Sequence, residues 1–170
     1  MTEHSKERRK FKRYNMDAEI HFDFIYDLET KVKFEIIDQE DKKVTSDKYL
    51  AISRNISVGG LCFVSSKKLK QAELLHLEVY LPGAKDPIHM IGRVEWCKPV
   101  PPSYEDRILE EMESKRVYEV GVRLLSVNEV SVDESIHHDA VYDVDWSIVL
   151  ESVFGSYKTL MEGIFKSQSE

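Results

Sequence analysis

A two-residue alternation of apolar and polar side chains is the feature that most constrains the fold of this chain. Between residues 14 and 26, apolar residues occupy every second position from Met16 onward, and mostly charged residues lie between them. Side chains of a strand point alternately to opposite faces, so this pattern predicts a half-buried strand. Shorter stretches with strand-like patterns follow at 32–36, 48–54, 61–65, 74–81, 88–97 and 118–125. Many short strands separated by turn signals predict a closed barrel or a sandwich.

The segments between these strands carry turn residues. Residues 27–30 interrupt the first alternation, and we interpret them as the turn of a hairpin. Residues 39–46 form a second polar turn, and the proline- and glycine-containing stretch 82–87 predicts a third. Gly92 lies within a strand pattern, which indicates a bulge or a close backbone approach.

The last third of the chain changes from a strand period to a helical one. A short amphipathic helix is predicted from Ser103, and a longer one over 145–168 with Asp145 as its N-cap. Gly155 and Gly163 each lower helix propensity by about 1 kcal/mol relative to alanine, so packing must hold the longer helix. Two interpretations stay open: a lid on the barrel, or a surface for self-association.

Composition excludes several classes of function. The 170 residues carry a formal net charge of −7, which opposes a broad nucleic-acid-binding face but leaves room for a small anionic ligand at one local cationic site. No stretch approaches the ~18 apolar residues of a membrane span, and the N-terminus is too polar for a secretory signal, so we expect a cytoplasmic protein. Cys62 and Cys97 are expected to be reduced core residues.

Residues 7–13 place five cations in seven positions of this acidic chain. Three of them, Arg8, Arg9 and Arg13, are arginines, whose planar guanidinium binds phosphate or the edge of guanine through two hydrogen bonds and stacks on bases. Basic N-terminal runs are also common as solvated tails. The run therefore needs a folded partner before it indicates a binding site.

Residues 55–60, Asn-Ile-Ser-Val-Gly-Gly, offer such a partner. Paired glycines permit positive φ and let a ligand approach the backbone closely, while Asn55 and Ser57 bond readily to neighbouring amides. The same residues would also serve as an ordinary turn between two strands.

Other candidate sites are weaker. His137 and His138 with Asp139 suggest a metal site, but the chain has no HxxxH, HExxH or Cys/His spacing, so we predict no metal. There is no GxSxG elbow and no P-loop, and we find no catalytic constellation. We interpret Arg93 and Arg123 as outward surface charges.

The sequence Arg9-Lys10-Phe11-Lys12-Arg13 fits an RxxxR motif, and Asn55-Ile56-Ser57-Val58-Gly59-Gly60 fits [DN]xSxxG. Occurring in this order with strand patterns between them, the two motifs resemble the PilZ family of bacterial cyclic di-GMP receptors. The stretches 92–96 and 120–124 also look like strands of that family. The resemblance covers about residues 6–126, and the helical region from residue 145 lies outside it.

The resemblance implies a six-stranded antiparallel β-barrel with a flexible N-terminal arginine loop, to which this chain adds a C-terminal helix. The two RxxxR arginines would contact phosphates and guanines, the second motif would line the opposite side of the pocket, and an arginine just before RxxxR goes with binding of an intercalated ligand dimer. The implied ligand-binding residues are Arg8, Arg9, Arg13, Asn55, Ser57 and Gly60. The corresponding segments are a basic loop at 1–13, a barrel at 14–126, a linker at 127–144 and the helix at 145–168.

Two departures from the family pattern stand out. The distance along the chain from Arg13 to Asn55 is long, which we attribute to an extended hairpin over 26–46. Asn55 stands where Asp is commoner, so it keeps an acceptor but loses a charge, and binding is expected to be weaker or altered at worst.

The leading hypothesis is a non-enzymatic cyclic di-GMP receptor that changes its contacts with a downstream protein partner. Motility, biofilm and exopolysaccharide control are the processes that the family implies. The alternative is a PilZ-like interaction module that binds no nucleotide and acts through its C-terminal helix, by which it could form a homodimer. A third possibility is that the basic run binds an anionic membrane or nucleic acid, although no DNA or RNA partner and no membrane span are expected.

Overall fold

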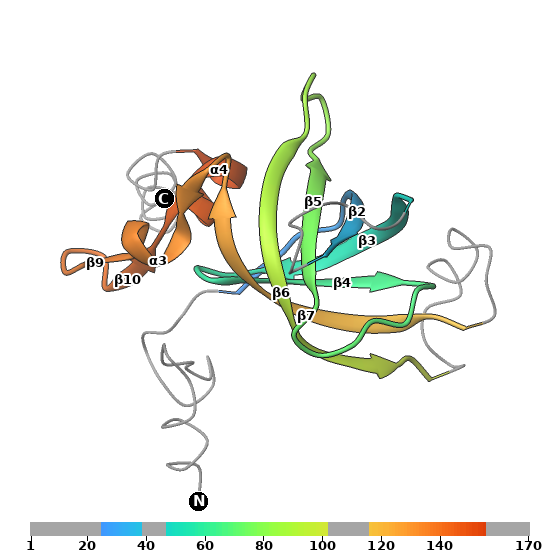
Figure 1. Ribbon diagram of the computed structural model, residues 1–170. Helices are drawn as coiled ribbons and strands as arrows, with labels where there is room; N and C mark the ends of the chain where they lie inside the picture. Colours follow the sequence, from blue (N-terminus) through green and yellow to red (C-terminus); the bar gives the residue numbers. More distant parts are fainter. Residues whose placement is uncertain (1–24, 39–46, 102–115, 156–170) are drawn as a thin grey trace, which may run out of the picture.

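The computed structural model describes residues 25–38, 47–101 and 116–155, and its main body is a closed antiparallel barrel (Figure 1). The barrel strands are β2 (Lys31–Ile37), β3 (Tyr49–Ile56), β4 (Gly60–Ser65), β5 (Leu74–Tyr80), β6 (Ile88–Pro99) and β7 (Tyr118–Val127). They pair in the order β3-β2-β5-β6-β7-β4, and pairing of β4 with β3 closes the ring. The predicted six-stranded antiparallel barrel is confirmed.

Alternate residues of each strand fill the inside of the barrel. On β5, Leu75, Leu77 and Val79 are fully buried. Phe34 of β2 and Phe63 of β4 meet across the interior with ring centroids 5.2 Å apart. Each such side chain contributes roughly 1.5–3 kcal/mol through burial. The alternation read from the sequence is therefore the pattern that builds the core.

The predicted hairpin turn at 27–30 is wrong. The preceding strand, β1 (Tyr26–Asp27), pairs with β3 and not with β2. Asp27 faces Asn55 and Lys31 faces Ile52, so residues 28–30 lie opposite residues 53–54. Three residues on one strand facing two on the other make a one-residue bulge. β1 and β2 therefore follow one another in the same direction along one edge of β3 and do not form a hairpin.

Ser53 holds this bulge together. It is buried, and its hydroxyl accepts a hydrogen bond from the backbone N–H of Thr30 at 2.9 Å and donates one to the carbonyl of Leu28. Backbone bonds from Leu28 to the Arg54 carbonyl and from Ser53 to the Thr30 carbonyl, each 2.9 Å, flank the hydroxyl. One side chain thus satisfies two backbone groups that the bulge leaves without ladder partners.

Two other local predictions are confirmed. The register shifts between Ile91 and Gly92, and a Cβ on Gly92 would lie 2.3 Å from a methyl carbon of Val122, so Gly92 marks both a bulge and a close approach. Gly83 takes a φ of +77° in the turn between β5 and β6. Most of the predicted strand 14–26, the turn 39–46 and the whole predicted helix from Ser103 lie outside the described residues.

The C-terminal unit, residues 130–154, follows the barrel. It consists of β8 (Val130–Ser131), α3 (Val132–Ser135), β9 (His137–Asp139), β10 (Val144–Trp146) and α4 (Ile148–Phe154). The segment 127–144, for which we expected a linker, therefore contains several of these elements. Figure 1 shows the unit gathered at one end of the barrel, where the turn between β3 and β4 also lies.

The boundaries of the predicted C-terminal helix need correction. Asp145 is not the N-cap, because it belongs to β10; Ser147 caps α4 by accepting a hydrogen bond from the N–H of Val149 at 3.1 Å. The helix ends at Phe154, since Gly155 takes a φ of +81°. The rest of the predicted range, 156–168, lies outside the described residues.

α4 and β10 pack onto the barrel. Trp146, Val149 and Leu150 are buried in the same core cluster as the barrel interior. The ring of Tyr26, from β1, contacts Trp146 edge-on at 6.4 Å between centroids and Phe154 at 4.7 Å. In this part of the chain, the apolar stripe forms a lid on the barrel.

Replacing Ser53 with alanine tests the bulge. The Thr30 N–H and the Leu28 carbonyl would lose their buried partner, so Ser53→Ala is expected to lower the free energy of unfolding by about 1–3 kcal/mol. Ser66→Ala, at an exposed position close to the same sheet, is the control and should change stability by less than about 0.5 kcal/mol. Chemical denaturation measures both, and equal stabilities for the two variants would contradict the role given to Ser53.

Candidate functional site

The structure brings three of the predicted site residues together in the turn between β3 and β4. Asn55 lies near the end of β3, Ser57 follows the strand, and Gly60 begins β4. The N–H of Ser57 donates to the Gly60 carbonyl at 2.9 Å. Arg8, Arg9 and Arg13 lie outside the described residues, so their part in the site stays a prediction.

Gly60 is required by packing and not by an unusual φ. Among the described glycines, only Gly83 and Gly155 have positive φ. A Cβ on Gly60 would lie 3.1 Å from the Val122 carbonyl oxygen of β7. The neighbouring Gly59 accepts a hydrogen bond from the N–H of Leu124 at 2.8 Å. The missing side chain of Gly60 thus lets the turn lie close to the backbone of β7, and the Gly59 carbonyl ties it there.

The same turn is held from inside by the C-terminal unit. Val58, in the middle of the turn, is buried, and its carbonyl accepts a hydrogen bond from the hydroxyl of Ser147 at 2.6 Å. Ser147 is itself buried and is the N-cap of α4. With backbone bonds on one side and Ser147 on the other, the turn has a fixed shape in which its polar groups are already placed.

A row of directly opposed residues crosses the outer face of the barrel and begins at Asn55. Asn55 faces Cys62 of β4, Cys62 faces Gly121 of β7, and Gly121 faces Trp96 of β6. Directly opposed residues of a sheet point to the same face. Leu61 and Phe63, on either side of Cys62, are in the core, so Cys62 points outward. Its expected place in the core is therefore wrong, and it forms no disulfide with Cys97.

Trp96 is a candidate site residue that was not among the residues predicted from the sequence. Because Trp96 alternates with Val94, the strand pattern alone predicts that it faces the core, but the register shifts between Val94 and Trp96, and this bulge turns the indole outward. The side chain is 39% exposed and lies over Gly121, where a Cβ would come within 2.2 Å of the ring. The ammonium of Lys98 lies 5.1 Å from the ring centroid. A glycine opposite a tryptophan on the neighbouring strand is the signal that could have revealed it.

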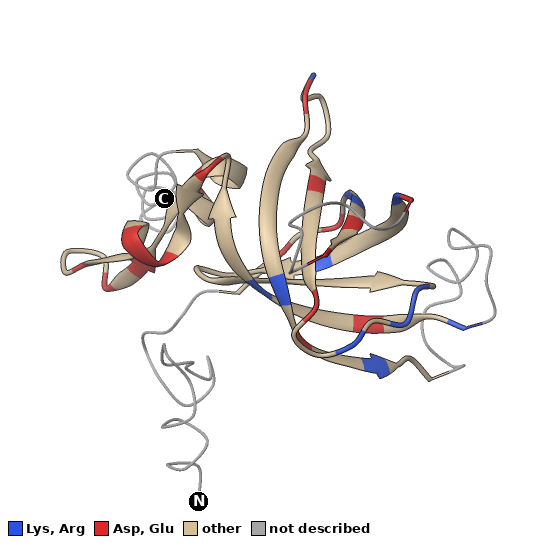
Figure 2. Cartoon of the chain, viewed as in Figure 1, with Lys and Arg blue, Asp and Glu red and all other residues tan. Residues whose placement is uncertain are grey.

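Basic residues lie next to this row. Arg123 of β7 pairs in register with Gly60 on one side and with Arg93 of β6 on the other. Figure 2 shows basic segments of β6 and β7 close together, and acidic segments on the nearby C-terminal unit. Arg93 is exposed, and Arg123 forms an ion pair with Asp133 of α3 at 3.1 Å. This part of an acidic chain therefore carries local positive charge.

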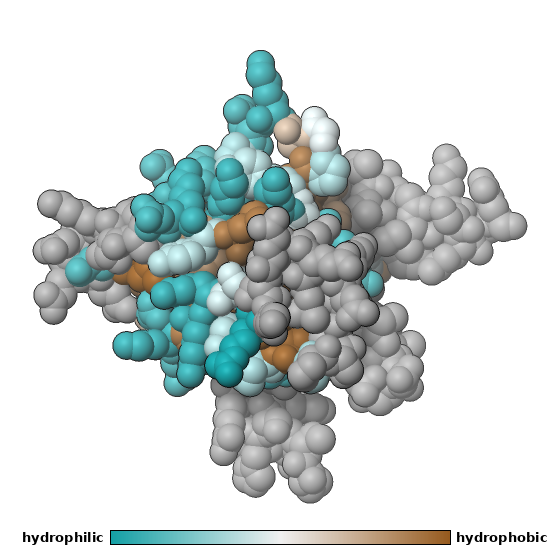
Figure 3. Space-filling view, turned by 90° about the vertical axis from the view of Figure 1, so that its right-hand side faces the viewer, coloured by the Kyte–Doolittle hydropathy of each residue, from teal (hydrophilic) through white to brown (hydrophobic). Residues whose placement is uncertain are grey.

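The exposed large hydrophobic residues of the described part are dispersed over different elements. They are Ile25, Leu50, Trp96, Val130 and Val141. Figure 3, which turns the right-hand side of Figure 1 toward the reader, shows hydrophobic side chains as separate patches among hydrophilic ones. Among these five, Trp96 is the one aromatic side chain and is therefore the one suited to stack on a base.

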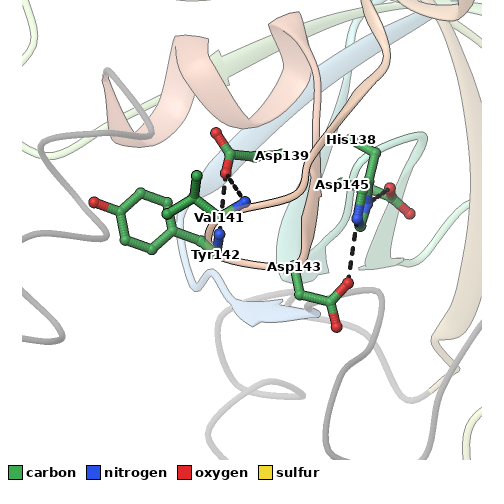
Figure 4. Close-up of polar contacts among 6 residues, drawn as sticks. All are labelled: His138, Asp139, Val141, Tyr142, Asp143 and Asp145. Atoms are coloured by element: carbon green, nitrogen blue, oxygen red, sulfur yellow. Dashed lines mark hydrogen bonds and ion pairs between the residues drawn. The ribbon is translucent and has the colours of Figure 1, made fainter.

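The β9–β10 hairpin contains the histidines that suggested a metal site (Figure 4). The imidazole of His138 lies 2.9 Å from the Asp145 carboxylate and 3.2 Å from that of Asp143. Asp139 accepts hydrogen bonds from the N–H groups of Val141 and Tyr142 in the hairpin turn. No group of three or more metal-ligating side chains is found among the described residues. The polar contacts of His138 thus hold a hairpin together.

The hydrogen bond to Asp145 raises the pKa of His138 above its ordinary value, and the charge of Asp143 adds to this effect. A raised pKa favours the protonated imidazole, which is the form that pairs with both carboxylates.

Within the described residues, no helix is long and apolar enough to cross a membrane.

Comparison with known proteins gives one match to a protein family. Residues 7–136 match the model of the PilZ domain. No curated protein matches the chain.

Two solved structures resemble the chain. One is the Bacillus subtilis inhibitor of motility (MotI/DgrA), with 16% identity and a TM-score of 0.43 over 62% of this chain and 42% of that protein. The other is the PilZ domain with c-di-GMP of YcgR from Escherichia coli, with 12% identity and a TM-score of 0.42 over 61% of this chain and 76% of that one. The chain thus spans less than half the length of the Bacillus protein.

The raised pKa of His138 predicts how the hairpin responds to pH. Its ion pairs stabilise the folded chain fully below the ordinary histidine pKa of about 6.5, and this stabilisation is lost as pH rises through the higher folded pKa. Asp145→Asn removes the main cause, so the midpoint of the His138 titration, followed by NMR, should fall. Asp86→Asn, in the exposed turn between β5 and β6, should leave it unchanged. An unaltered midpoint in Asp145→Asn would show that the pairing is absent in solution.

Proposed function

The chain belongs to the PilZ domain family, and we propose that it is a non-enzymatic cytoplasmic receptor for cyclic di-GMP. Ligand binding changes its contacts with a downstream protein, as the motility, biofilm and exopolysaccharide roles of the family suggest. The observation that carries the proposal is the preformed turn at 55–60. It presents Asn55 on the outer face of the barrel, in one row with Trp96, and places Gly60 next to Arg123.

The chemistry of the ligand matches these groups. Cyclic di-GMP has two phosphates and two guanines, so a receptor needs bidentate cations, hydrogen-bonding groups for the guanine edges and flat surfaces for stacking. In this proposal Arg8, Arg9 and Arg13 supply the cations, because charge-assisted pairs with phosphate are the strongest hydrogen bonds available. Asn55, Ser57 and the backbone at Gly60 form the polar floor. The indole of Trp96 stacks on a guanine, which is worth about 1–3 kcal/mol per base.

The local charge supports the same assignment. A chain with a net charge of −7 repels an anion on average, so binding requires a site where cations outnumber carboxylates. Arg93 and Arg123 lie side by side next to the turn, and Lys98 lies over Trp96. Arg54 and Lys98 also share the carboxylate of Glu119, which orders the basic side chains on this face.

The alternative of a nucleotide-free interaction module receives less support. It needs an exposed apolar helix face, but Trp146, Val149 and Leu150 are buried against the barrel. The described part of the helical stripe is thus already used for packing.

Isothermal titration calorimetry with cyclic di-GMP tests the proposed function. Arg9→Ala and Arg13→Ala should each weaken binding by about tenfold or more, because each removes a charge-assisted hydrogen bond worth roughly 1.5–3 kcal/mol. Lys12→Ala removes one charge from the same run without removing an arginine fork, and should weaken binding only slightly. The thermal melting temperature should be the same in all three variants.

The same titration separates the proposed face from other parts of the barrel. Trp96→Ala should weaken binding, whereas Tyr80→Ala should not, although Lys33 lies over the Tyr80 ring much as Lys98 lies over Trp96. Absence of any heat of binding by the wild-type chain at tens of micromolar ligand in low salt would rule the proposal out. Equal loss in Trp96→Ala and Tyr80→Ala would place the ligand elsewhere.

A further inference from the structure

The C-terminal unit contacts the candidate ligand face through an exposed ion pair between Arg123 and Asp133. Arg123 belongs to β7 and lies in register with Gly60 of the motif turn. Asp133 lies in the first turn of α3, and its carboxylate is 3.1 Å from the guanidinium. The two side chains are 33% and 41% exposed, so a ligand from solvent can reach the pair.

The surroundings of Arg123 favour a second anion. Arg93 lies directly opposite Arg123 on β6, and like charges at such positions destabilise a sheet. Asp133 neutralises one member of this pair, while no ion pair to Arg93 is found within the described parts of the chain. The two guanidiniums together therefore carry more positive charge than Asp133 balances. A phosphate diester has the charge and the paired oxygens to bind there.

The ion pair is linked to the rest of the C-terminal unit by a chain of hydrogen bonds. The hydroxyl of Ser135, at the end of α3, accepts a bond from the N–H of Ile148 at 3.0 Å, which ties α3 to the first turn of α4. Ser147, next in the chain, donates to Val58 inside the motif turn. Displacement of α3 would therefore be transmitted to α4 and to the turn itself.

We propose that Asp133 is an internal competitor of the ligand for Arg123, so that cyclic di-GMP binding releases α3 from β7. This inference rests on the proposed function. Without ligand, the carboxylate of Asp133 holds the guanidinium and ties the exposed side of α3 to β7. When a ligand phosphate takes the guanidinium, α3 loses this tie. α3 has only four residues, one side-chain cap and one buried side chain, Val132, so the ion pair is a sizeable part of what orders its exposed side. The C-terminal unit then presents a changed surface to a partner.

Substitution of Asp133 gives the test, with Glu134→Gln as the matched control. Glu134 is the next residue of α3, is exposed and carries the same charge. Asp133→Asn should bind cyclic di-GMP about two- to fivefold more tightly than the wild type, the range expected for loss of an exposed competing ion pair. Glu134→Gln should bind with nearly wild-type affinity. Arg123→Gln should weaken binding and, in combination with Asp133→Asn, remove the gain.

The outcomes distinguish this inference from the function on which it rests. Binding by the wild type, with equal or weaker binding by Asp133→Asn, would overturn the competition and leave the receptor function standing. A gain of equal size in Glu134→Gln would reduce the effect to general electrostatics and would also overturn it. Failure of every variant to bind would overturn both. Thermal melting of each variant shows whether it is folded. If Asp133→Asn does not fold, Asp133→Ser replaces it in the same titration.

Discussion

The pairing of both edges of β3 is the constraint on which the rest of the structure depends. One edge pairs with β4 and closes the barrel, and the other pairs with β2 and β1 in sequence. Both edges are irregular near Ser53, where three residues face two on one side and the register shifts before Asn55 on the other. Because this irregularity follows the barrel-lining part of β3, Asn55 comes to lie on the outer face. The position of the candidate site is therefore a consequence of how the barrel closes.

The C-terminal unit shares its core with the motif turn. Ile56 and Val58 of the turn region lie in the same buried cluster as Trp146, Val149 and Leu150. Burial of these side chains stabilises the lid and the turn together, and the Ser147 hydroxyl joins them by a hydrogen bond. A module built in this way can convert a small change at its surface into a change of the lid, because packed cores move between discrete arrangements and do not deform continuously. The described part of the predicted C-terminal helix, residues 148–154, thus belongs to the same structural unit as the candidate site.

The sequence predicted most of the barrel, since each strand reveals itself through a local alternation and each turn through its glycine, proline or polar residues. What it could not reveal depends on partners far along the chain. Residues 27–30 look the same in a hairpin and in a bulge, and only pairing with Ser53 distinguishes the two. A bulge likewise turns the Trp96 side chain from the inner face of the barrel to the outer face. Asp145 fits an N-cap locally, but the hairpin that it forms with His138 moves the helix start to Ile148. At the candidate site, the polar residues and glycines of 55–60 predicted a turn, and a turn joins β3 to β4 there, whereas the neighbouring groups on β6 and β7 could be placed only from the strand register.

Hydrogen–deuterium exchange with and without cyclic di-GMP tests whether ligand binding at the motif turn affects the C-terminal unit, because it reports on both in one experiment. Backbone amides at 55–61 should exchange more slowly when ligand is added, and those of α3 at 132–135 should exchange faster. Barrel strand β5, on the far side of the ring, should be unchanged. Ligand binding without protection of the motif turn, or with protection confined to other strands, would show that the ligand does not bind at this turn.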